Sequence, residues 1–351
     1  MRIVDGTVVF DRSDLYFVEK FGPLEAAEMV MDFYSCNSHP FLYDTHQLAS
    51  FFGCRHRTVF QCVREHDKLY RKVEIPKRNG GVRKLSVPMP YLAMLQQRIL
   101  HGFLGHFPVS SYATAYRKGV DLGENAAPHC GKRYLLKLDL EDFFGSITFP
   151  MVYQAAFGPS RFPKQIGTML TALCCYKDCL PQGACTSPAL SNLVMKWIDE
   201  TLGAWCEKRG VSYTRYCDDL TFSADRPLYD VYNKAVSLLE SRGFTVNESK
   251  TRFITRAGRQ TVTGLVVNEK TGVAADYKRR LRQELHYAVT YGIADAAARV
   301  QFEGTPRNYA HRLLGQLNFV LRFDPQNQWF LRARQQLFGR MRDEGLCSTP
   351  W

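Results

Sequence analysis

The stretch Tyr216-Cys217-Asp218-Asp219 lies between two short segments that are rich in β-branched and aromatic residues. The upstream segment is Val211 to Tyr216, and the downstream segment is Leu220-Thr221-Phe222. This pattern predicts two strands that meet at a tight turn, with two adjacent carboxylates at its tip. The carboxylates repel each other, and a divalent cation with a preference for hard oxygen ligands relieves that repulsion. The alternative is a solvated Asp-Asp turn, so a metal site requires a third carboxylate from another strand.

Asp139 is the candidate for this third carboxylate. The segment from Leu135 to Leu140 is an apolar run interrupted by charge, which predicts a buried strand that emerges into a loop at Asp139. Asp139, Asp218 and Asp219 together are suited to hold two metal ions. Two such ions stabilise the attacking and leaving oxygens of an in-line phosphoryl displacement.

These residues resemble the palm signature of reverse transcriptases, in which an Asp on a strand, an aromatic residue five positions later and a Tyr-x-Asp-Asp hairpin occur in that order. Three further segments resemble motifs of that family at the expected places: Gly81–Pro88 followed by Gln96, Leu180–Pro188, and Gly243–Lys250. The resemblance runs from about residue 45 to about residue 320. It implies an α+β right-hand polymerase with fingers, palm and thumb, an antiparallel palm sheet and a helical thumb.

The resemblance also implies roles for individual residues. The implied catalytic residues are Asp139, Asp218, Asp219 and Lys250. The three aspartates, with Leu140, are the implied site of two Mg²⁺ ions, for which Mn²⁺ is a possible substitute. The implied contacts to the incoming dNTP are Lys77, Arg83, Phe144 and Gln182.

Each of these roles has a simpler alternative. Phe144 is implied to crowd a 2′-OH and so to select dNTP over rNTP, but Phe143 and Phe144 both suit a core, and alternation sends one of them there. Lys77 and Arg83 also fit a solvated basic hairpin, and Lys250 fits an ordinary surface lysine.

Two short segments resemble signatures of retron reverse transcriptases. Asn125-Ala126-Ala127-Pro128-His129 resembles their Asn-Ala-x-x-His signature, and Val262-Thr263-Gly264 resembles their Val-Thr-Gly signature. The resemblance implies that Asn125, His129 and Thr263 contact a structured noncoding RNA from the same locus. It further implies a guanosine 2′-OH as primer, a branched RNA–DNA product (msDNA), and a role in antiphage defence with an effector protein. For Asn125 and His129, a local capping or packing pair is the alternative.

The charge balance indicates a polyanionic partner. The 351 residues contain 46 Lys or Arg and 34 Asp or Glu, a net charge of +12. From Asp276 to Arg342 we count 12 basic and 5 acidic residues in a helical pattern, with Leu281, Leu285 and Ala288 on one face. We interpret this segment as a basic thumb. The predicted RNA contacts are Arg279, Arg280 and Arg282, with Arg312, Arg332 and Arg334 as further candidates, although charge runs are often solvated faces.

Other features bound the organisation of the chain. Eleven cysteines without a Cys-x-x-Cys pair indicate reduced thiols in the cytoplasm, and we find neither a signal pattern nor a membrane-spanning run. The expected divisions are a helical lead-in at 1–69, fingers at 70–134, a palm at 135–274 with fingers elements around 150–180, and a thumb at 275–351.

Two local patterns predict further features. Residues 47–54 also resemble part of a helix-turn-helix. Ser187 is predicted to cap a helix that faces Trp197 inward.

Two rival functions remain at this stage. One is another bacterial reverse transcriptase, of the group II intron or abortive-infection type, and an intron enzyme is expected to carry a longer C-terminal region. The other is a basic RNA-binding protein with a degenerate polymerase fold, which the intact Asp139, Asp218 and Asp219 argue against.

Overall fold

The computed structural model describes residues 1–76 and 80–346. The chain forms two compact units, each built from three segments. The first unit consists of Met1–Lys118, Lys137–Leu220 and Tyr229–Thr251. The second unit consists of Gly119–Leu136, Thr221–Leu228 and Arg252–Trp351. None of the helices in the described part of the chain combines the length and apolar character that crossing a membrane requires.

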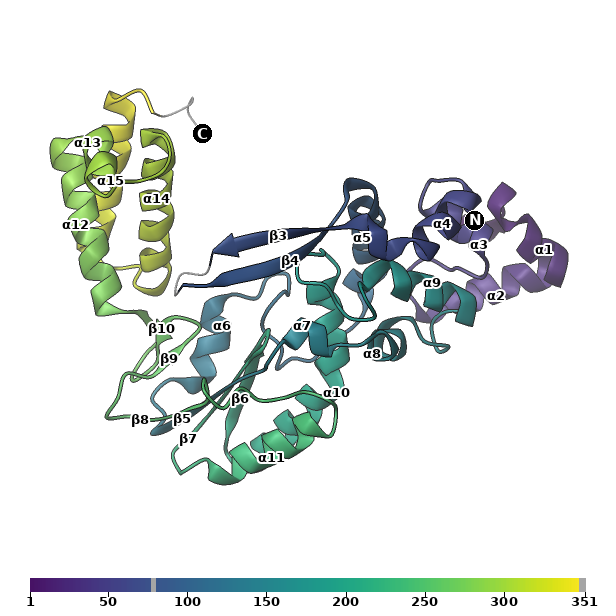
Figure 1. Ribbon diagram of the computed structural model, residues 1–351, viewed down its shortest axis with the longest axis horizontal. Helices are drawn as coiled ribbons and strands as arrows, with labels where there is room; N and C mark the ends of the chain where they lie inside the picture. Colours follow the sequence, from purple (N-terminus) through teal and green to yellow (C-terminus); the bar gives the residue numbers. More distant parts are fainter. Residues whose placement is uncertain (77–79, 347–351) are drawn as a thin grey trace. The chain divides into compact units, whose positions relative to one another are not determined.

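A four-stranded sheet carries the predicted catalytic aspartates, and its strand order is β6-β7-β5-β8 (Figure 1). The strands are β5 (Tyr134–Asp139), β6 (Ser212–Tyr216), β7 (Asp219–Ala224) and β8 (Arg252–Thr255). In β7, all residues after Asp219 are buried, the pattern of a strand covered on both faces. The predicted strands on both sides of the Asp-Asp turn, and the predicted strand that ends at Asp139, are confirmed.

Helix α10 (Ser187–Glu207) packs against β6 and against α11 (Tyr229–Glu240). The predicted cap is wrong: Thr186 occupies the N-cap position, and the Ser187 hydroxyl instead donates to the Pro181 carbonyl at 2.7 Å. The prediction that Trp197 faces inward is also wrong, since this side chain is 48% exposed. The buried stripe passes through Ile198, and one residue turns a helix by about 100°.

A long antiparallel ribbon matches the predicted fingers hairpin. Strand β3 (Tyr70–Pro76) pairs with β4 (Val82–Pro88), from Tyr70 opposite Pro88 to Pro76 opposite Val82. Gly80 and Gly81 have φ angles of 82° and 79°, left-handed values that glycine adopts without a steric penalty. Lys77 and Asn79 lie outside the described residues.

Shorter elements complete the first unit. The N-terminal part has strands β1 (Arg2–Val4) and β2 (Thr7–Val9) and helices α1 (Leu15–Phe21), α2 (Pro23–Cys36), α3 (Thr45–Phe51) and α4 (His56–Arg64). Phe17, Ala26 and Val30 form its small core. The remaining helices are α5 (Pro90–Gly102), α7 (Phe143–Ser146), α8 (Phe149–Val152) and α9 (Lys164–Cys174).

The second unit contains the predicted helical bundle. Its helices are α6 (Leu122–Ala126), α12 (Ala275–Tyr291), α13 (Ile293–Arg299), α14 (Pro306–Phe323) and α15 (Gln328–Asp343). Figure 1 shows α12 to α15 gathered side by side, and α12 packs with each of the other three. Leu281, Leu285 and Ala288 are buried as predicted. A small sheet with the order β11-β10-β9 precedes the bundle, with β9 (Thr261–Val262), β10 (Leu265–Val266) and β11 (Gly272–Val273).

Candidate active site

The two adjacent carboxylates lie where a two-residue turn joins β6 to β7. Strand β6 ends at Tyr216 and β7 begins at Asp219, so Cys217 and Asp218 make the connection. Cys217 has a φ of 60°, the left-handed conformation that such tight hairpin turns need. Asp218 and Asp219 are partly buried. The predicted carboxylate turn is therefore present.

Backbone hydrogen bonds bring the third aspartate to the same place. The Leu140 N–H donates to the Asp218 carbonyl at 3.1 Å, and the Asn247 N–H donates to the Asp139 carbonyl at 2.8 Å. Burial raises the pKa of Asp219; the Lys137 charge opposes that rise, and the carboxylates of Asp218 and Asp139 add to it. The three aspartates thus form one electrostatic group.

Lys250 occupies this group as an ion-pair partner. Its Nζ donates to Asp139 Oδ1 at 2.6 Å, and this hydrogen bond raises the pKa of Lys250. The resemblance implies a catalytic role for Lys250, and the structure pairs its charge with the carboxylate of Asp139. A lysine in this position stays protonated at neutral pH and can act as a proton donor.

A cavity of about 510 Å³ in the first unit opens beside the turn. Among the residues that line it are five of the predicted site: Arg83, Phe144, Gln182, Asp218 and Asp219. Asp139 and Lys250 are not among the lining residues. The structure therefore gathers residues from the fingers ribbon, the segment after β5, the loop before α10 and the carboxylate turn around one space.

The loop before α10 is fixed to the fingers ribbon. The Ser86 N–H donates to the Gln182 carbonyl at 2.7 Å. Gly183 has a φ of 124°, and a Cβ added there would lie 3.0 Å from the Ser86 carbonyl oxygen. The Gly183 backbone thus approaches strand β4 closely, which holds the loop that carries Gln182 against the ribbon.

The two phenylalanines after β5 divide between core and cavity as predicted, although both belong to helix α7 and not to an alternating strand. Phe143 is 2% exposed and lies 6.1 Å from the ring of Phe244 in the core. Phe144 is partly buried and lines the cavity. Phe144 is therefore free to meet a ligand there.

The part of the chain that contains these residues matches a known protein family. The family model described as "Reverse transcriptase (RNA-dependent DNA polymerase)" matches residues 75–288, more than half of the chain. The chain belongs to the reverse transcriptase family. The α+β right-hand polymerase expected from the sequence is the fold of that family.

Two relatives narrow the type of reverse transcriptase. The retron Mx65 reverse transcriptase of Myxococcus xanthus is 38% identical over 251 residues, which are 66% of this chain and 58% of that protein. The retron Ec86 reverse transcriptase of Escherichia coli is 31% identical over 253 residues, 71% of this chain and 79% of that protein. The chain is therefore a retron-type reverse transcriptase, although it matches less than two thirds of the Mx65 protein. A solved telomerase from Candida albicans shares 10% identity at a TM-score of 0.42, covering 78% of this chain and 63% of that one.

Reverse transcriptases use divalent metal ions, and the donor chemistry of this site suits them. Carboxylate oxygens are the ligands that Mg²⁺ prefers, and the carboxylates of Asp218 and Asp139 add to the rise in the pKa of Asp219 that burial mainly causes. Within residues 1–76 and 80–346, however, no three His, Cys, Asp or Glu side chains are grouped closely enough to hold a metal. The three aspartates are thus close in space but do not form a ready metal site. Asp139 has to leave its ion pair with Lys250 before it can bind the same metal as Asp218 and Asp219.

A buried ion pair behind the turn of the reverse transcriptase escaped the sequence analysis. Arg215 and Asp199 are both fully buried, and Arg215 donates to both Asp199 carboxylate oxygens, at 2.8 and 2.7 Å. Arg215 Nη1 also donates to the Cys217 carbonyl at 2.9 Å. Loss of one partner of such a pair costs about 3–5 kcal/mol, because it leaves an unpaired buried charge. The only sequence signal was a charged residue within each of two apolar segments.

Both segments that resemble retron signatures belong to the second unit, and the polar side chains of the first segment are buried. Asn125 is 1% exposed and His129 is 0% exposed. His129 Nδ1 lies 2.7 Å from Ser223 Oγ, and burial lowers the pKa of His129 to about 3. The predicted RNA contact at these two positions is not supported by such burial, and the structure favours the packing alternative. Thr263, by contrast, is partly exposed.

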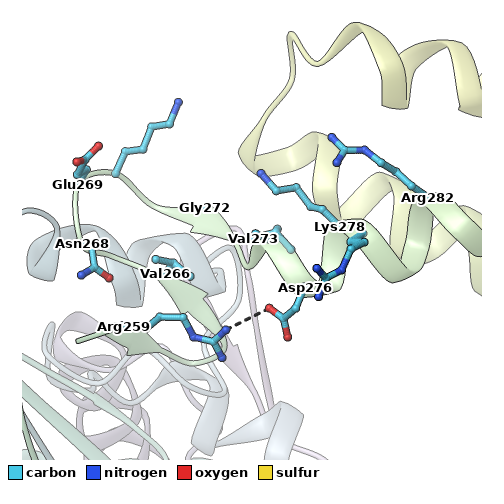
Figure 2. Close-up of a pocket in the computed structure, with 12 residues that line it drawn as sticks. Arg259, Val266, Asn268, Glu269, Gly272, Val273, Asp276, Lys278 and Arg282 are labelled. Atoms are coloured by element: carbon cyan, nitrogen blue, oxygen red, sulfur yellow. Dashed lines mark hydrogen bonds and ion pairs between the residues drawn. The ribbon is translucent and has the colours of Figure 1, made fainter. Parts of the chain in front are cut away.

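A basic cavity of about 770 Å³ lies in the second unit, between the small sheet and the start of α12 (Figure 2). Predicted contacts Arg279 and Arg282 line it, but Arg280 does not. Figure 2 shows Arg259 reaching Asp276, and its Nη1 donates to Asp276 Oδ1 at 3.1 Å. Three further cations line the cavity: Arg259, Lys270 and Lys278. Lys278 belongs to the basic segment from Asp276 to Arg342, whereas Arg259 and Lys270 precede that segment, and local charge counting does not connect them with it.

The other candidate arginines differ in availability. Arg312 donates to Glu284, and its guanidinium lies 4.8 Å from the ring centroid of Tyr309. Arg312 is therefore committed to internal contacts. Arg332 is exposed, and Arg334 is partly buried.

Proposed function

We propose that this retron-type reverse transcriptase copies part of a structured noncoding RNA from its own locus into single-stranded DNA that stays joined to the RNA. The observation that carries the proposal is the meeting of Asp218 and Asp219 with Arg83, Phe144 and Gln182 around one cavity. A nucleoside triphosphate needs cationic donors, a sugar contact and nearby carboxylates, and this cavity supplies all three. We infer the same division into fingers, palm and thumb that the sequence predicts.

Asp139, Asp218 and Asp219, with Leu140, would hold two Mg²⁺ ions, which supply positive charge to the attacking and leaving oxygens. Arg83 would donate to the triphosphate as a bidentate cation. Gln182 would hydrogen-bond the nucleotide or its template base, since its amide both donates and accepts. Phe144 would exclude a 2′-OH by contact with the sugar.

Lys250 would act at the end of the reaction. Its ammonium group is held 2.6 Å from Asp139 Oδ1, and this contact keeps it protonated. Where Asp139 served as a metal ligand, the Lys250 ammonium would be free to face the departing pyrophosphate and donate a proton to it. Lys250 would thus neutralise Asp139 in the site without metal and serve as general acid in the loaded site.

The basic cavity of the second unit would hold the RNA backbone. Five cations line it: Arg259, Lys270, Lys278, Arg279 and Arg282. Two acids, Glu269 and Asp276, share the lining, and Asp276 is paired with Arg259. Excess positive charge around a hollow suits phosphate oxygens of any sequence. Arg280 and Thr263 would make contacts outside this lining.

The biological setting is part of the same proposal. The RNA primer would be a guanosine 2′-OH within the noncoding RNA, and an effector protein from the same locus would act with the complex in antiphage defence. A reducing cytoplasm agrees with the cysteines, since all ten that the structure describes are free thiols.

The test is the linkage between RNA and DNA. The protein is co-expressed with RNA from its own locus, and the bound nucleic acid is treated with a debranching enzyme and analysed on a gel. A DNA released only by debranching is the expected result, with the Asp218→Asn variant as the control that makes no DNA. DNA that is unlinked, or joined through a 3′–5′ bond, would reject retron priming and leave the polymerase assignment standing.

A further inference from the structure

Tyr116 belongs to none of the sequence motifs, yet it touches two parts of the active site. It lines the same cavity as Arg83, Phe144 and Gln182. Its hydroxyl donates to the Cys217 sulfur at 3.2 Å, although the two residues lie 101 positions apart. The residue is 52% exposed, so it is accessible from the cavity while its hydroxyl contacts the carboxylate turn.

The backbone at Tyr116 is held in an unfavourable conformation. Its φ is 61°, a left-handed value that costs an L-residue roughly 1–2 kcal/mol. Such conformations persist where the surroundings enforce them, and they cluster at functional sites. Here the Asn192 amide donates to the Ala115 carbonyl at 2.9 Å, and Arg117 Nη1 donates to the Ala113 carbonyl at 3.0 Å. Hydrogen bonds to the carbonyls of Ala113 and Ala115 thus hold the backbone that leads into Tyr116.

The same surroundings hold the carboxylate turn. The Thr114 N–H donates to the Arg215 carbonyl at 2.9 Å, which ties the Tyr116 segment to β6. Arg215 in turn donates to the Cys217 carbonyl. Cys217 is therefore fixed at its carbonyl by the buried ion pair and at its sulfur by Tyr116. Of these two contacts, only the second comes from a side chain that lines the cavity.

We propose that Tyr116 is a positioning residue for nucleotide transfer, whose hydroxyl holds Cys217 and thereby orients Asp218, while its ring forms the wall against which the incoming nucleotide is seated. This inference rests on the proposed nucleotide site. It separates two functions of one side chain: the ring sets nucleotide affinity, and the hydroxyl sets the rate of the chemical step. Asp218 follows Cys217 directly, so a rotation at Cys217 moves its carboxylate.

The test measures dNTP incorporation on a poly(rA) template with an oligo(dT) primer. Tyr116→Phe keeps the ring and loses the hydroxyl, so kcat should fall about fivefold, the effect of one hydrogen bond, with KM for dTTP unchanged. The Mg²⁺ concentration for half-maximal rate should rise, because Asp218 is less well oriented. Tyr116→Ala should also raise KM for dTTP at least about tenfold. The matched control is Tyr112→Phe, which removes a hydroxyl bonded to Glu207 at 2.6 Å and should change none of these values.

A double substitution separates positioning from simple destabilisation. Cys217→Ala should reproduce the kcat loss of Tyr116→Phe, and the double variant should lose no more than either alone, because both remove the same contact. A wild-type kcat for Tyr116→Phe, or additive losses in the double variant, would overturn the inference. A wild-type protein that incorporates no dTTP would instead overturn the proposed function, and this inference with it.

Discussion

The side-chain amide of Asn125 donates a hydrogen bond to the hydroxyl of Thr263 across 3.3 Å. The two residues lie 138 positions apart, one in each retron signature. Thr263 and Gly264 form the turn between β9 and β10, with φ angles of 46° and 84°. A β-branched residue is rarely found at positive φ, so Asn125 supports a turn that threonine disfavours. The two segments that resemble retron signatures are thus held together by a side-chain hydrogen bond.

This contact gives the first prediction. Asn125→Ala should destabilise the protein by about 1–2 kcal/mol, because it removes a buried donor from its partner. Thr263→Gly loses the same contact but relieves the left-handed backbone, so its loss should be smaller. Chemical denaturation measures both, and a larger loss for Thr263→Gly would contradict the assignment of strain. Because Thr263 is partly exposed, its substitution should also reduce self-primed product more than extension of a supplied primer.

The second prediction concerns the carboxylates. Asp218→Asn or Asp219→Asn should lower dNTP incorporation at least about 100-fold, because each removes charge that stabilises the transition state. The melting temperature should stay near that of the wild type. Asp225→Asn is the control: Asp225 pairs with Lys132 at 3.5 Å in the second unit, and its loss should leave activity intact. Near-normal incorporation by a folded Asp218→Asn protein would exclude the catalytic role.

The third prediction tests sugar selection at Phe144. Phe144→Ala should raise the ratio of rNTP to dNTP incorporation by about tenfold or more, because the ring no longer crowds the 2′-OH. Phe143→Leu is the matched control, since Phe143 is 2% exposed in the core. That variant should lose stability and keep the ratio. An unchanged ratio in an active Phe144→Ala enzyme would place the selection elsewhere.

The fourth prediction concerns RNA binding by α12. Reversing the charges of Arg279, Arg280 and Arg282 to Glu should weaken RNA binding across sequences. It should also flatten the salt dependence of log K by about 2, at about 0.7 per lost phosphate contact for single strands. The same three reversals at Arg55, Arg57 and Arg64, exposed on or beside α4, change the net charge equally. If both triple variants lose affinity alike, net charge rather than the basic cavity controls binding.

The fifth prediction follows from the buried His129. The folded protein binds a proton there with a pKa of about 3, whereas the unfolded chain does so near 6.5. Below pH 6.5 the unfolded state therefore binds more protons, and stability falls as the pH falls. Between pH 6.5 and 5 this one group should account for about 2 kcal/mol of lost stability. His129→Gln should lack this component, whereas substitution of the exposed His286 should keep it; identical pH slopes for all three proteins would refute the assignment.

Local patterns in the sequence determined where the secondary structure lies. The strands around Asp218 and Asp219 and the buried face of α12 follow from periodicities that span only a few residues. The errors were also local. Trp197 lies beside the buried face of α10 and is 48% exposed, and one position separates the predicted cap from Thr186. The apolar segment before Asp139 likewise predicts a buried strand that ends at this residue, and β5 ends there.

Only the tertiary structure decided which polar residues are buried and with which partners. Arg215 and Asp199 pair inside the core, Tyr116 reaches Cys217, and Asn125 reaches Thr263. A polar residue in a sequence looks the same whether it faces water or a partner, and its environment is set by segments that lie far away along the chain. The energy of burying such a group depends on that partner, because an unpaired buried charge or amide is unfavourable. The candidate catalytic residues are therefore visible in the sequence, whereas the contacts that hold them in place exist only once the chain has packed.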